Sequence, residues 1–594
     1  MRRPRLPGVT SPLLPALQSP AGPAASREAV RFGDLSLSYG RLAEASAALA
    51  ARIADAGRVA VWATPTPETV IAVVAALHAG VPAVPLNPRT GERELAHILA
   101  DSAPTAVLAG PDDALPAALE KLRRVTVDAR AAAAPEPGER YARGAADAAG
   151  PVAFGAPGDA DEGGPAAPVT PAATGDTADS ESPALIVYTS GTTGPPKGAV
   201  LPRRAIAASL DALEDAWGWT EDDVLVHALP LFHVHGLILG VLGPLRRGGS
   251  VRHLGKFSPE GVARELGSGG TMLFGVPTMY HRLAELLDGT DQPSPADGRT
   301  NPAPPAFSAS QPAQASQADG RTGRADSRAG RAAWPGGAPE ASVPSAPGPD
   351  ACGTPAGALA AALAGARLLV SGSAALPVHD HERIAAATGR RVIERYGMTE
   401  TLMNTGIRAD GVPRPGTVGP PLAGVDLRLV EDDGTVLDAP GSIGEIQVRG
   451  PNLFTGYLNR PDATAAALTA DGFFRTGDVG TVDEDGYVTL VGRKATDLIK
   501  SGGYKIGAGE IENVLLTHPG VREAAVTGEP DPDLGERVVA WVVAVAPDSP
   551  PSVEELAGYV AAQLAPHKRP RTVRYLDALP RNDLGKIMKR SLRA

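Results

Sequence analysis

The sequence predicts an α/β protein with a large N-terminal domain of doubly wound sheets and a small C-terminal α+β domain. Helix-like and strand-like segments alternate over the first half of the chain, a strand-rich stretch follows, and the pattern becomes compact α+β beyond Lys494. Alternating strands and helices are typical of parallel sheets that carry helices on both faces. We therefore expect the large domain in residues 26–493 and the small domain in residues 494–594.

The early segments alternate regularly. Residues 39–57 (YGRLAEASAALAARIADAG) have apolar residues at helical spacing and end at a glycine, which predicts a helix. Residues 58–63 (RVAVWA) predict a buried strand, residues 67–80 (PETVIAVVAALHAG) a second helix, and residues 81–86 (VPAVPL) the next strand. This order indicates parallel pairing, because each helix returns the chain to the same end of the sheet.

The alternation resumes near residue 184 and continues to the small domain. Further strands are expected at residues 185–188, 223–230, 250–255, 271–277 and 366–372, with helices from about Arg203 and over 377–389. The strand-rich stretch covers 425–437, 444–450 and 486–493, with turn signals at DDG and DEDG. In the small domain we expect helices over 509–520 and 553–564 and strands over 521–528 and 537–545.

Three segments do not fit a packed core. Residues 131–182 and 288–357 are rich in small residues and proline and contain few large apolar side chains. Such segments cannot bury enough apolar surface to offset the conformational entropy that ordering costs. We expect both to be disordered insertions, or else segments that bind a partner, and residues 1–25 to be a flexible N-terminus.

The composition argues against several classes of function. Lys+Arg 56 and Asp+Glu 67 give a net charge of −11, which disfavours nucleic acid as the main partner. The single cysteine, Cys352, cannot form an internal disulfide, and no Cys/His set has zinc-ligand spacing. No apolar run suits a membrane span or a signal peptide. We expect a cytoplasmic protein without nucleic-acid or membrane partners, whose oligomeric state the sequence leaves open, a monomer included.

The segment with the clearest chemistry is Tyr188–Gly198, YTSGTTGPPKG. A predicted buried strand leads into a loop of three glycines, three threonines, one serine and one lysine. Small residues let backbone N–H groups and hydroxyls approach phosphate oxygens, and Lys197 adds positive charge. Because the Walker A pattern is absent, this is a different kind of phosphate loop; an ordinary glycine-rich turn is the alternative.

Together with four later motifs, this loop resembles the adenylate-forming superfamily of acyl-CoA synthetases, adenylation domains and luciferases. The motifs follow in the family's order as Tyr396–Glu400 (YGMTE), Arg475–Asp478 (RTGD), Gly502–Glu512 (GGYKIGAGEIE) and Asn582–Lys586 (NDLGK). The resemblance covers nearly all of the chain outside the two insertions and the extreme N-terminus. It implies a large domain that also carries a small distorted β-barrel subdomain, and a C-terminal domain that moves.

The resemblance implies an enzyme that couples a carboxylic acid to ATP and then to coenzyme A. Both reactants of the first step are anions, so the protein must mainly position them and neutralise charge. The implied catalytic residues are Lys586, Thr399, Glu400 and His233, and Glu400 with Thr192 would hold Mg²⁺. The implied ATP-binding residues are Thr189, Ser190, Gly191, Thr192, Thr193, Gly194, Lys197, Tyr396, Gly397, Met398, Asp478 and Arg493.

Coenzyme A would bind after the small domain rotates and removes Lys586 from the site. The implied contacts with coenzyme A lie in one loop of the small domain, at Ser501, Gly502, Gly503 and Tyr504. The family's hinge stretch usually runs Arg-x-Lys/Asp-Asp, whereas residues 493–497 here read RKATD. Either Lys494 or Thr496 could be the hinge, and the basic residue that contacts the ribose stays open.

Two further segments point to the acid. Residues 275–282 (GVPTMYHR) resemble the acyl-pocket strand and helix of the family, and residues 367–404 closely resemble the bacterial malonyl-CoA synthetases. In those enzymes an arginine at the position of Arg282 pairs with the distal carboxylate of malonate. A planar and permanently charged guanidinium suits that role. The alternative is that Arg282 lies on a solvated helix face.

Other residues would shape the same pocket. The resemblance implies that Ser373 donates a second hydrogen bond to the distal carboxylate and that Met398 limits bulk at the α-carbon. His233 and His235 either line the acyl pocket near the carboxylate or simply pack at the end of a strand.

The preferred interpretation is an ATP- and Mg²⁺-dependent ligase that converts malonate and coenzyme A to malonyl-CoA, AMP and pyrophosphate. Methylmalonate and other small 2-substituted malonates are further candidate substrates. A ligase for acetate, medium-chain or aromatic acids is the nearer alternative, and Arg282 argues against it. A non-catalytic scaffold that binds acyl-adenylates is the more distant one, and the intact Lys586, Glu400 and Asp478 argue against it.

Overall fold

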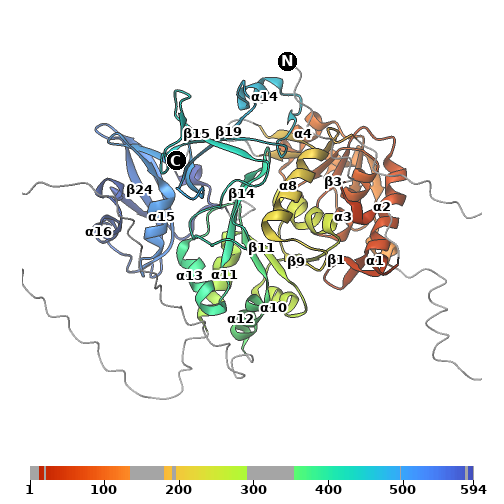
Figure 1. Cartoon of the computed structure of the whole chain (residues 1–594), viewed down its shortest axis with the longest axis horizontal. Helices are drawn as coiled ribbons and strands as arrows, with labels where there is room; N and C mark the ends of the chain where they lie inside the picture. Colours follow the sequence, from red (N-terminus) through yellow and green to blue (C-terminus); the bar gives the residue numbers. More distant parts are fainter. Residues whose placement is uncertain are drawn as a thin grey trace, which may run out of the picture.

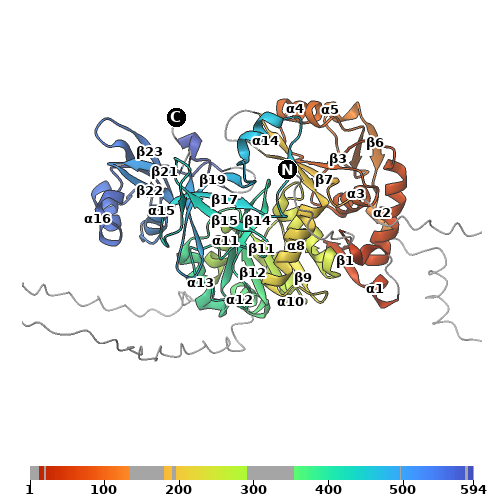
Figure 2. The same ribbon diagram turned by 45° about the horizontal axis from the view of Figure 1, so that its top comes forward.

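The computed structural model describes residues 13–18, 22–133, 179–189, 195–289, 354–494, 497–581 and 586–592. The described chain forms a large domain and, beyond strand β20 (Val488–Arg493), a small domain that lies beside it (Figure 1). Figure 2 shows the same two parts in a tilted view. The α/β fold class expected from the alternating segments is confirmed.

The first sheet of the large domain has eight strands. In spatial order they are β14 (Leu402–Gly406), β13 (Val392–Met398), β12 (Leu368–Ser371), β11 (Met272–Gly275), β9 (Val224–His227), β10 (Ser250–His253), β1 (Glu28–Phe32) and β2 (Leu35–Ser38). Strands β13 to β1 pair in parallel, whereas β14 and β2 are antiparallel edge strands. Parallel strands end at the same edge, so the segments that follow β11, β12 and β13 gather there.

The second sheet has seven strands and carries the phosphate loop. Its order is β18 (Gly456–Tyr457), β8 (Lys197–Pro202), β7 (Pro183–Thr189), β4 (Ala83–Leu86), β3 (Val59–Trp62), β5 (Ala106–Ala109) and β6 (Arg123–Thr126). Strands β7 to β6 pair in parallel, and β7, β8 and β18 pair antiparallel. The loop between β7 and β8 therefore turns back along the sheet.

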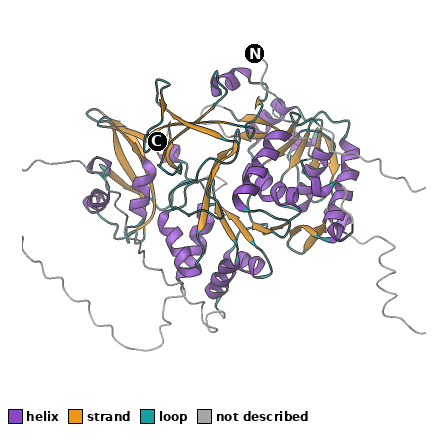
Figure 3. Cartoon of the chain, viewed as in Figure 1, coloured by secondary structure: helices purple, strands orange, loops and turns teal. Residues whose placement is uncertain are grey.

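Two helices lie between these sheets. Helix α3 (Pro67–His78) contacts β1 of the first sheet and β3, β4 and β5 of the second. Nearly all of it is buried, including every residue of Thr69–Leu77. A helix that is apolar all round suits this position because both of its faces meet a sheet. Helix α8 (Arg203–Trp217) likewise contacts β8 and β14, and Figure 3 shows the helices packed among and around the strands.

The large domain has further helices, of which η2 is completely buried. The longer ones are α2 (Tyr39–Ile53), α4 (Glu92–Ser102), the π-helix η2 (His235–Leu242), α10 (Pro259–Gly267), α11 (Pro277–Asp288), α12 (Pro355–Gly365), α13 (Val378–Thr388) and α14 (Pro461–Ala467). The shorter ones are η1 (Pro15–Leu17), α1 (Pro23–Ser26), α5 (Ala117–Glu120), α6 (Ala129–Ala133) and α9 (Gly243–Arg247). Each helix in the described ranges is too short or too polar to span a lipid bilayer.

The strand-rich stretch forms a third sheet, which is antiparallel throughout. Its order is β16 (Val436–Leu437), β15 (Asp426–Val430), β17 (Gly444–Arg449), β19 (Phe474–Val482) and β20. In the described residues, β16 and β20 form its two edges and do not pair with each other. Strands β19 and β20 bring this sheet to the junction with the small domain.

The small domain has a five-stranded sheet with two helices. Strands β22 (Tyr504–Gly507), β21 (Leu498–Ser501), β24 (Gly535–Ala544) and β23 (Val521–Asp531) form its path, and β25 (Thr572–Tyr575) pairs with β24. Helices α15 (Ala508–Leu516) and α16 (Val553–Gln563) pack on it, and the short helices η4 (Pro566–Lys568) and η5 (Lys589–Leu592) follow. Helix α15 also contacts β20 and α13 of the large domain.

The structure corrects the expected limits of the irregular segments. Residues 1–25 were expected to be flexible, yet Leu13, Leu14 and Leu17 are buried because η1 packs on α2 and α9. The expected insertion 131–182 begins inside α6, and the expected insertion 288–357 begins at the last residue of α11 and ends inside α12. Local helix formation continues a few residues past the change in composition at these edges. Most of both insertions lies outside the described residues.

A buried carboxylate joins three strands of the first sheet at their amino ends. Asp223, which is 2% exposed, accepts two hydrogen bonds of 2.5 Å from Arg367, which lies directly before β12. It also accepts bonds of 2.9 Å from the Thr220 amide and the Thr271 hydroxyl. Burial alone would raise the pKa of Asp223, but the bonds and charge of Arg367 outweigh burial and lower it.

We predict that Asp223→Asn lowers the free energy of unfolding by about 2 kcal/mol, since it leaves Arg367 without its anion while that side chain keeps some solvent. Because the folded-state pKa is the lower one, this stabilisation is complete above the ordinary aspartate pKa. It is lost as the pH falls through the folded value. Denaturant titrations at neutral and acidic pH measure both effects. Asp410→Asn, which breaks the exposed pair with Arg408, is the matched control and should change little; equal losses in both variants would contradict the prediction.

Candidate active site

The candidate site lies where the carboxyl ends of β11, β12 and β13 meet the third sheet and the small domain. Gly275 at the end of β11 pairs with Ser371 at the end of β12. Strand β13 ends at Met398, directly before Thr399 and Glu400. Open α/β sheets bind ligands outside the carboxyl ends of their strands. The fold therefore places the motif Tyr396–Glu400 at this edge of the sheet.

Asp478 is the centre of one buried polar cluster. Its Oδ2 accepts a 2.6 Å hydrogen bond from the Tyr396 hydroxyl, and its Oδ1 lies 2.7 Å from Nε of Arg493. Burial raises the pKa of Asp478, and the positive charge of Arg493 offsets this effect only in part. The structure therefore brings together three residues that the sequence assigned to the nucleotide.

Lys586 of the small domain approaches the same cluster. Loss of surrounding water lowers the pKa of Lys586, and the charge of nearby Arg493 lowers it further, while Asp497 and Asp478 act in the opposite direction. The Lys586 side chain is nevertheless exposed to solvent. The predicted catalytic lysine is therefore within electrostatic range of the predicted ribose-binding carboxylate in this arrangement of the two domains. Residues 582–585, the rest of its motif, lie outside the described residues.

In the connection between the domains, residues only a few positions apart have ion-pair partners in different domains. Nζ of Lys494 lies 2.8 Å from Asp432, in the turn between β15 and β16, and 2.9 Å from Glu445 of β17. Asp497 lies 3.1 Å from Nζ of Lys589 in the small domain and also accepts a 3.1 Å hydrogen bond from the Arg493 amide. Lys494 thus pairs with residues of the large domain, whereas Asp497 contacts both domains. Residues 495 and 496, including the hinge candidate Thr496, lie outside the described residues.

The phosphate loop is described only at its two ends. Thr189 ends β7 and Lys197 begins β8, and the Thr189 hydroxyl is 3.4 Å from the Lys197 carbonyl oxygen. The predicted loop residues Ser190, Gly191, Thr192, Thr193 and Gly194 lie outside the described residues. The ammonium group of Lys197 sits 4.3 Å from the centre of the Tyr457 ring, a cation–π contact.

Glu400 is a buried carboxylate close to the same tyrosine. Its Oε1 accepts a 2.8 Å hydrogen bond from the Tyr457 hydroxyl, and its carbonyl oxygen accepts one from the Phe454 amide. Thr399, directly before it, is half-buried. The sequence assigned Glu400 to a metal but did not single out Tyr457, because a lone tyrosine in GYLNR carries no charge pattern.

The histidines assigned to the acyl pocket follow β9. His235 begins η2 and is buried, with Nδ1 3.5 Å from the Ser373 hydroxyl, while its Nε2 has no hydrogen-bond partner in the described residues. Burial lowers the pKa of His235 far below the usual histidine range, and the charge of Arg395 adds to this effect. His233 is half-buried, and its ring packs on Phe232 at 4.5 Å between ring centres. His235 is therefore a neutral group at the sheet edge.

Arg395 is a residue that the sequence analysis missed. It lies on β13 and is 4% exposed, yet its Nε and Nη2 atoms have no hydrogen-bond partner among the described residues. Burial lowers its pKa to about 10. A Cβ added at Gly372 would lie 2.4 Å from the guanidinium carbon, so the group rests directly on that glycine, beside Ser373. The only signal in the sequence was a cation within a run that otherwise reads as a buried strand.

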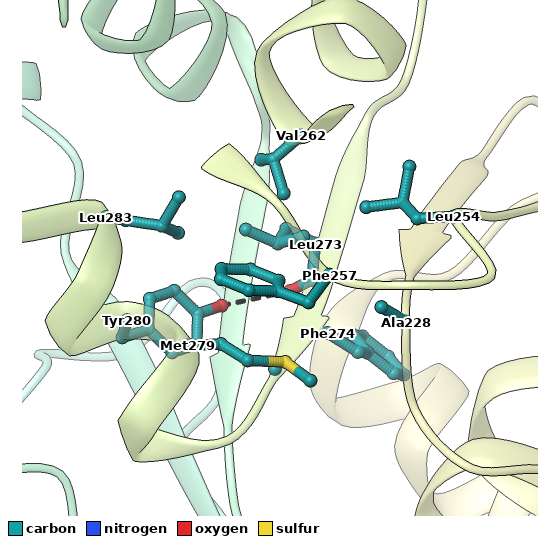
Figure 4. Close-up of a pocket in the computed structure, with 10 residues that line it drawn as sticks. Ala228, Leu254, Phe257, Val262, Leu273, Phe274, Met279, Tyr280 and Leu283 are labelled. Atoms are coloured by element: carbon teal, nitrogen blue, oxygen red, sulfur yellow. Dashed lines mark hydrogen bonds between the residues drawn. The ribbon is translucent and has the colours of Figure 1, made fainter. Parts of the chain in front are cut away.

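The other residues assigned to the acid lie on α11 and β13. Arg282 is exposed on α11, and no described residue pairs with it. Met398 is half-buried at the end of β13. Beside them, the space between β11, α10 and α11 is lined by apolar groups and leaves no room for a water molecule in the described structure. Figure 4 shows Met279, Tyr280 and Leu283 converging on Phe257 and Leu273.

The loop assigned to coenzyme A is a tight hairpin at the surface. Ser501 pairs with Tyr504 across the Gly502-Gly503 turn, in which both glycines have positive φ. A two-residue hairpin with this backbone requires glycine-like residues. The Tyr504 ring is 55% exposed and stacks on His567 at 4.0 Å. The hairpin is thus rigid, solvent-facing and presented by the small domain.

This arrangement defines a two-domain enzyme that binds a nucleotide at the carboxyl edge of an α/β sheet, and comparison identifies its family. The AMP-binding enzyme model matches residues 18–458, and the AMP-binding enzyme C-terminal domain model matches residues 510–586. The chain belongs to the AMP-binding enzyme family, as the five motifs predicted.

Individual proteins that resemble the chain give a more specific comparison than the family models. The chain is 60% identical to a malonyl-CoA ligase solved as a ternary product complex with methylmalonyl-CoA and AMP, over 96% of this chain and 100% of that one, with a TM-score of 0.60. It is 30% identical to ATP-bound MatB from Rhodopseudomonas palustris, over 98% of both chains, with a TM-score of 0.72. It is 37% identical to the malonate–CoA ligase of Arabidopsis thaliana over 70% of this chain, and it spans 60% of that protein's length.

Proposed function

We propose that this chain is an AMP-forming acid–thiol ligase that activates malonate. The observation that carries the choice of acid is Arg395, a buried guanidinium without a described partner, beside the neutral His235 and the backbone of Gly372. A buried cation without an anion is costly, so a ligand that supplies an anion has a site prepared for it. Malonate supplies a second carboxylate, which a monocarboxylic acid lacks. The similarity to malonyl-CoA ligases supports the same acid.

In the first half-reaction, a carboxylate oxygen of malonate attacks the α-phosphorus of ATP. The bond from that phosphorus to the bridging oxygen breaks, which gives malonyl-adenylate and pyrophosphate. Lys586 would stabilise the charge between carboxylate and α-phosphate, and Thr399 would donate its hydroxyl to the α-phosphate. Asp478 would accept the ribose hydroxyls, with Arg493 and Tyr396 holding its carboxylate in place. His233 would lie near the reacting carboxylate.

The β- and γ-phosphates would lie in the loop that joins β7 and β8. Thr189 and Lys197 at its ends, with the residues between them, would supply hydroxyls, backbone N–H groups and one positive charge. Gly397 and Met398 would line the nucleotide beside Tyr396.

Mg²⁺ fits the residues present. Glu400 has one carboxylate oxygen bound by Tyr457 and the other without a described partner, and Thr192 would be a second ligand. Sites of this kind use one or two carboxylates together with phosphate oxygens and water. No cluster of three or more His, Cys, Asp or Glu in the described ranges could hold a metal. When bound, the ion would neutralise phosphate charge.

In the second half-reaction, the thiol sulfur of coenzyme A attacks the carbonyl carbon of malonyl-adenylate. The carbon–oxygen bond to AMP breaks, and malonyl-CoA and AMP are released. The hairpin Ser501–Tyr504 would contact coenzyme A after the small domain has turned and moved Lys586 away from the reacting groups.

The pocket for the rest of the acid would be small and charged. Arg395 on β13 and Arg282 on α11 would both bind the distal carboxylate of malonate. The hydroxyl of Ser373 would donate a further hydrogen bond to it. Met398 would limit the size of a substituent on the α-carbon. The filled apolar space beside β11 leaves no described room for a long alkyl chain.

The direct test of this function is pyrophosphate release with ATP and Mg²⁺ across malonate, methylmalonate, sulfoacetate, acetate, octanoate and benzoate. Each acid is run with and without coenzyme A, and the thioester is read by mass. Preference for malonate with malonyl-CoA as product supports the proposal. Preference for a monocarboxylate would support the ligase activity but contradict malonate as the substrate. No turnover with any of the acids would favour a non-catalytic scaffold.

Arg395→Met should raise the KM for malonate about 100-fold, because charged hydrogen bonds to the distal carboxylate are lost. The KM for ATP should stay within about twofold. The melting temperature should not fall, since no described group loses a partner. Steady-state kinetics with both substrates varied measures the effect, and Arg282→Ala tests the second arginine in the same way. Arg391→Met, an exposed neighbour, is the control. An unchanged KM for malonate in Arg395→Met would remove this residue from the pocket.

Lys586→Ala should slow adenylate formation by about 100- to 1000-fold, since it removes a charge aimed at the reacting phosphate. Thioester formation from added malonyl-adenylate should be spared. Because the pKa of Lys586 is lowered, the rate of adenylate formation by the wild type should decrease as the pH rises. This decrease should occur at a pH below the ordinary pKa range of lysine. Lys586→Arg should move that fall to higher pH. The rate of pyrophosphate release measured against pH tests this. If the rate decreases at the same alkaline pH in the wild type and in Lys586→Arg, the titrating group is a different residue.

A further inference from the structure

One tyrosine touches both charged groups assigned to the phosphates and the metal. The Lys197 ammonium lies 4.3 Å from the centre of the Tyr457 ring, and the Tyr457 hydroxyl donates a 2.8 Å hydrogen bond to Oε1 of Glu400. No ion pair joins Lys197 to Glu400 in the described structure, although both contact the same side chain. The ring faces the cation, and the hydroxyl faces the anion.

The backbone of Tyr457 is fixed on several sides. Strand β18 pairs with β8, so that Tyr457 lies opposite Ala199, two residues beyond Lys197. The Tyr457 amide donates to the Thr464 hydroxyl at 2.9 Å, and the Leu458 amide donates to the Gly198 carbonyl at 2.8 Å. This strand of two residues is therefore anchored to the same strand that carries the lysine.

A second set of contacts ties the segment to helix α4. The Asn459 side chain donates to the carbonyl oxygen of Asp101 at 2.9 Å, and the carboxylate of Asp101 accepts a 2.7 Å bond from the Tyr188 hydroxyl. His97, on the same helix, lies 2.9 Å from the Pro196 carbonyl oxygen. Helix α4 thus holds both ends of the phosphate loop and the residues after Tyr457 in one frame.

We propose that Tyr457 is a positioning residue that keeps Lys197 and Glu400 apart and separately available, the one for the phosphates and the other for the metal of MgATP. A free lysine and a free carboxylate this close would otherwise neutralise each other, and a ligand would first have to break that pair. The aromatic face holds the ammonium by a cation–π contact that a phosphate can displace, because the contact is weaker than a charged hydrogen bond. The hydroxyl orients one oxygen of Glu400, and the other oxygen has no described partner. This inference rests on the proposed roles of Lys197 and Glu400.

Two substitutions separate the ring from the hydroxyl. Tyr457→Phe keeps the aromatic face for Lys197 and removes only the bond to Glu400. Tyr457→Leu removes both and allows Lys197 to reach Glu400. Tyr559→Phe is the matched control, because it deletes a tyrosine hydroxyl of α16 whose hydrogen bonds in the described structure are to Thr517 of the small domain. Melting temperatures of all three variants establish that each is folded.

Binding is measured by calorimetry with an ATP analogue blocked between the α- and β-phosphates, with and without Mg²⁺ and without any acid. Tyr457→Phe should weaken binding about tenfold with Mg²⁺ and leave binding without Mg²⁺ unchanged. Tyr457→Leu should weaken binding in both conditions, and a second change, Glu400→Gln, should restore part of its binding without Mg²⁺ because Lys197 loses its competing anion. Tyr559→Phe should bind as wild type.

The outcomes distinguish this inference from the proposed function. If wild type does not bind the analogue, the proposed function fails. If wild type binds and both Tyr457 variants bind equally well with and without Mg²⁺, the positioning role is overturned. Equal weakening of Tyr457→Phe in the two conditions would also overturn it, because a general loss of packing would not depend on the metal.

Discussion

The Asp478 carboxylate is the point on which the site depends, because three parts of the chain meet there. Tyr396 of β13 donates a hydrogen bond to it, Arg493 at the last residue of β20 pairs with it, and the charge of Lys586 in the small domain acts on it. Burial raises the pKa of Asp478, and these three groups favour its charged form. The carboxylate therefore links the position of the small domain to the first sheet, and a movement of the small domain changes the electrostatics of the site at once.

The site also contains a buried charge, on Arg395, that lacks the hydrogen-bond partners usual for a buried charge in a protein core. Asp223 is held by five hydrogen bonds at the amino end of the first sheet, where it stabilises the fold. Arg395, at the carboxyl end of the same sheet, is equally buried and has two N–H groups without described partners. A buried cation of this kind costs stability, which a fold tolerates where a ligand completes the interaction. One end of this sheet thus holds a buried charge with its partners, and the other end holds a buried charge whose N–H groups lack described partners.

Much of the fold could be predicted because its signals are local. The helix predicted over residues 39–57 is α2, and the strands predicted at 58–63 and 81–86 are β3 and β4, within a few residues. Each pattern arises from the burial of one face, which sequence periodicity records directly. The buried leucines near the N-terminus were missed because prolines interrupt them, and only packing against α2 and α9 orders the segment. The ranges of η2 and α14 were likewise not anticipated, since neither has a strong amphipathic period.

The candidate site, like the fold, could be predicted from the sequence only in part. The sequence by itself determined the family, the nucleotide motifs and the class of reaction, because glycine-rich loops and isolated acidic or basic residues keep their spacing wherever the chain runs. Only the tertiary structure decided that Arg395 is buried beside His235, that Arg282 faces solvent on α11, and that Tyr457 stands between Lys197 and Glu400. The physical reason is that these contacts join residues brought together by strand pairing and by the junction of two domains. Burial and the loss of water, which set the charge of each group, exist only after that assembly.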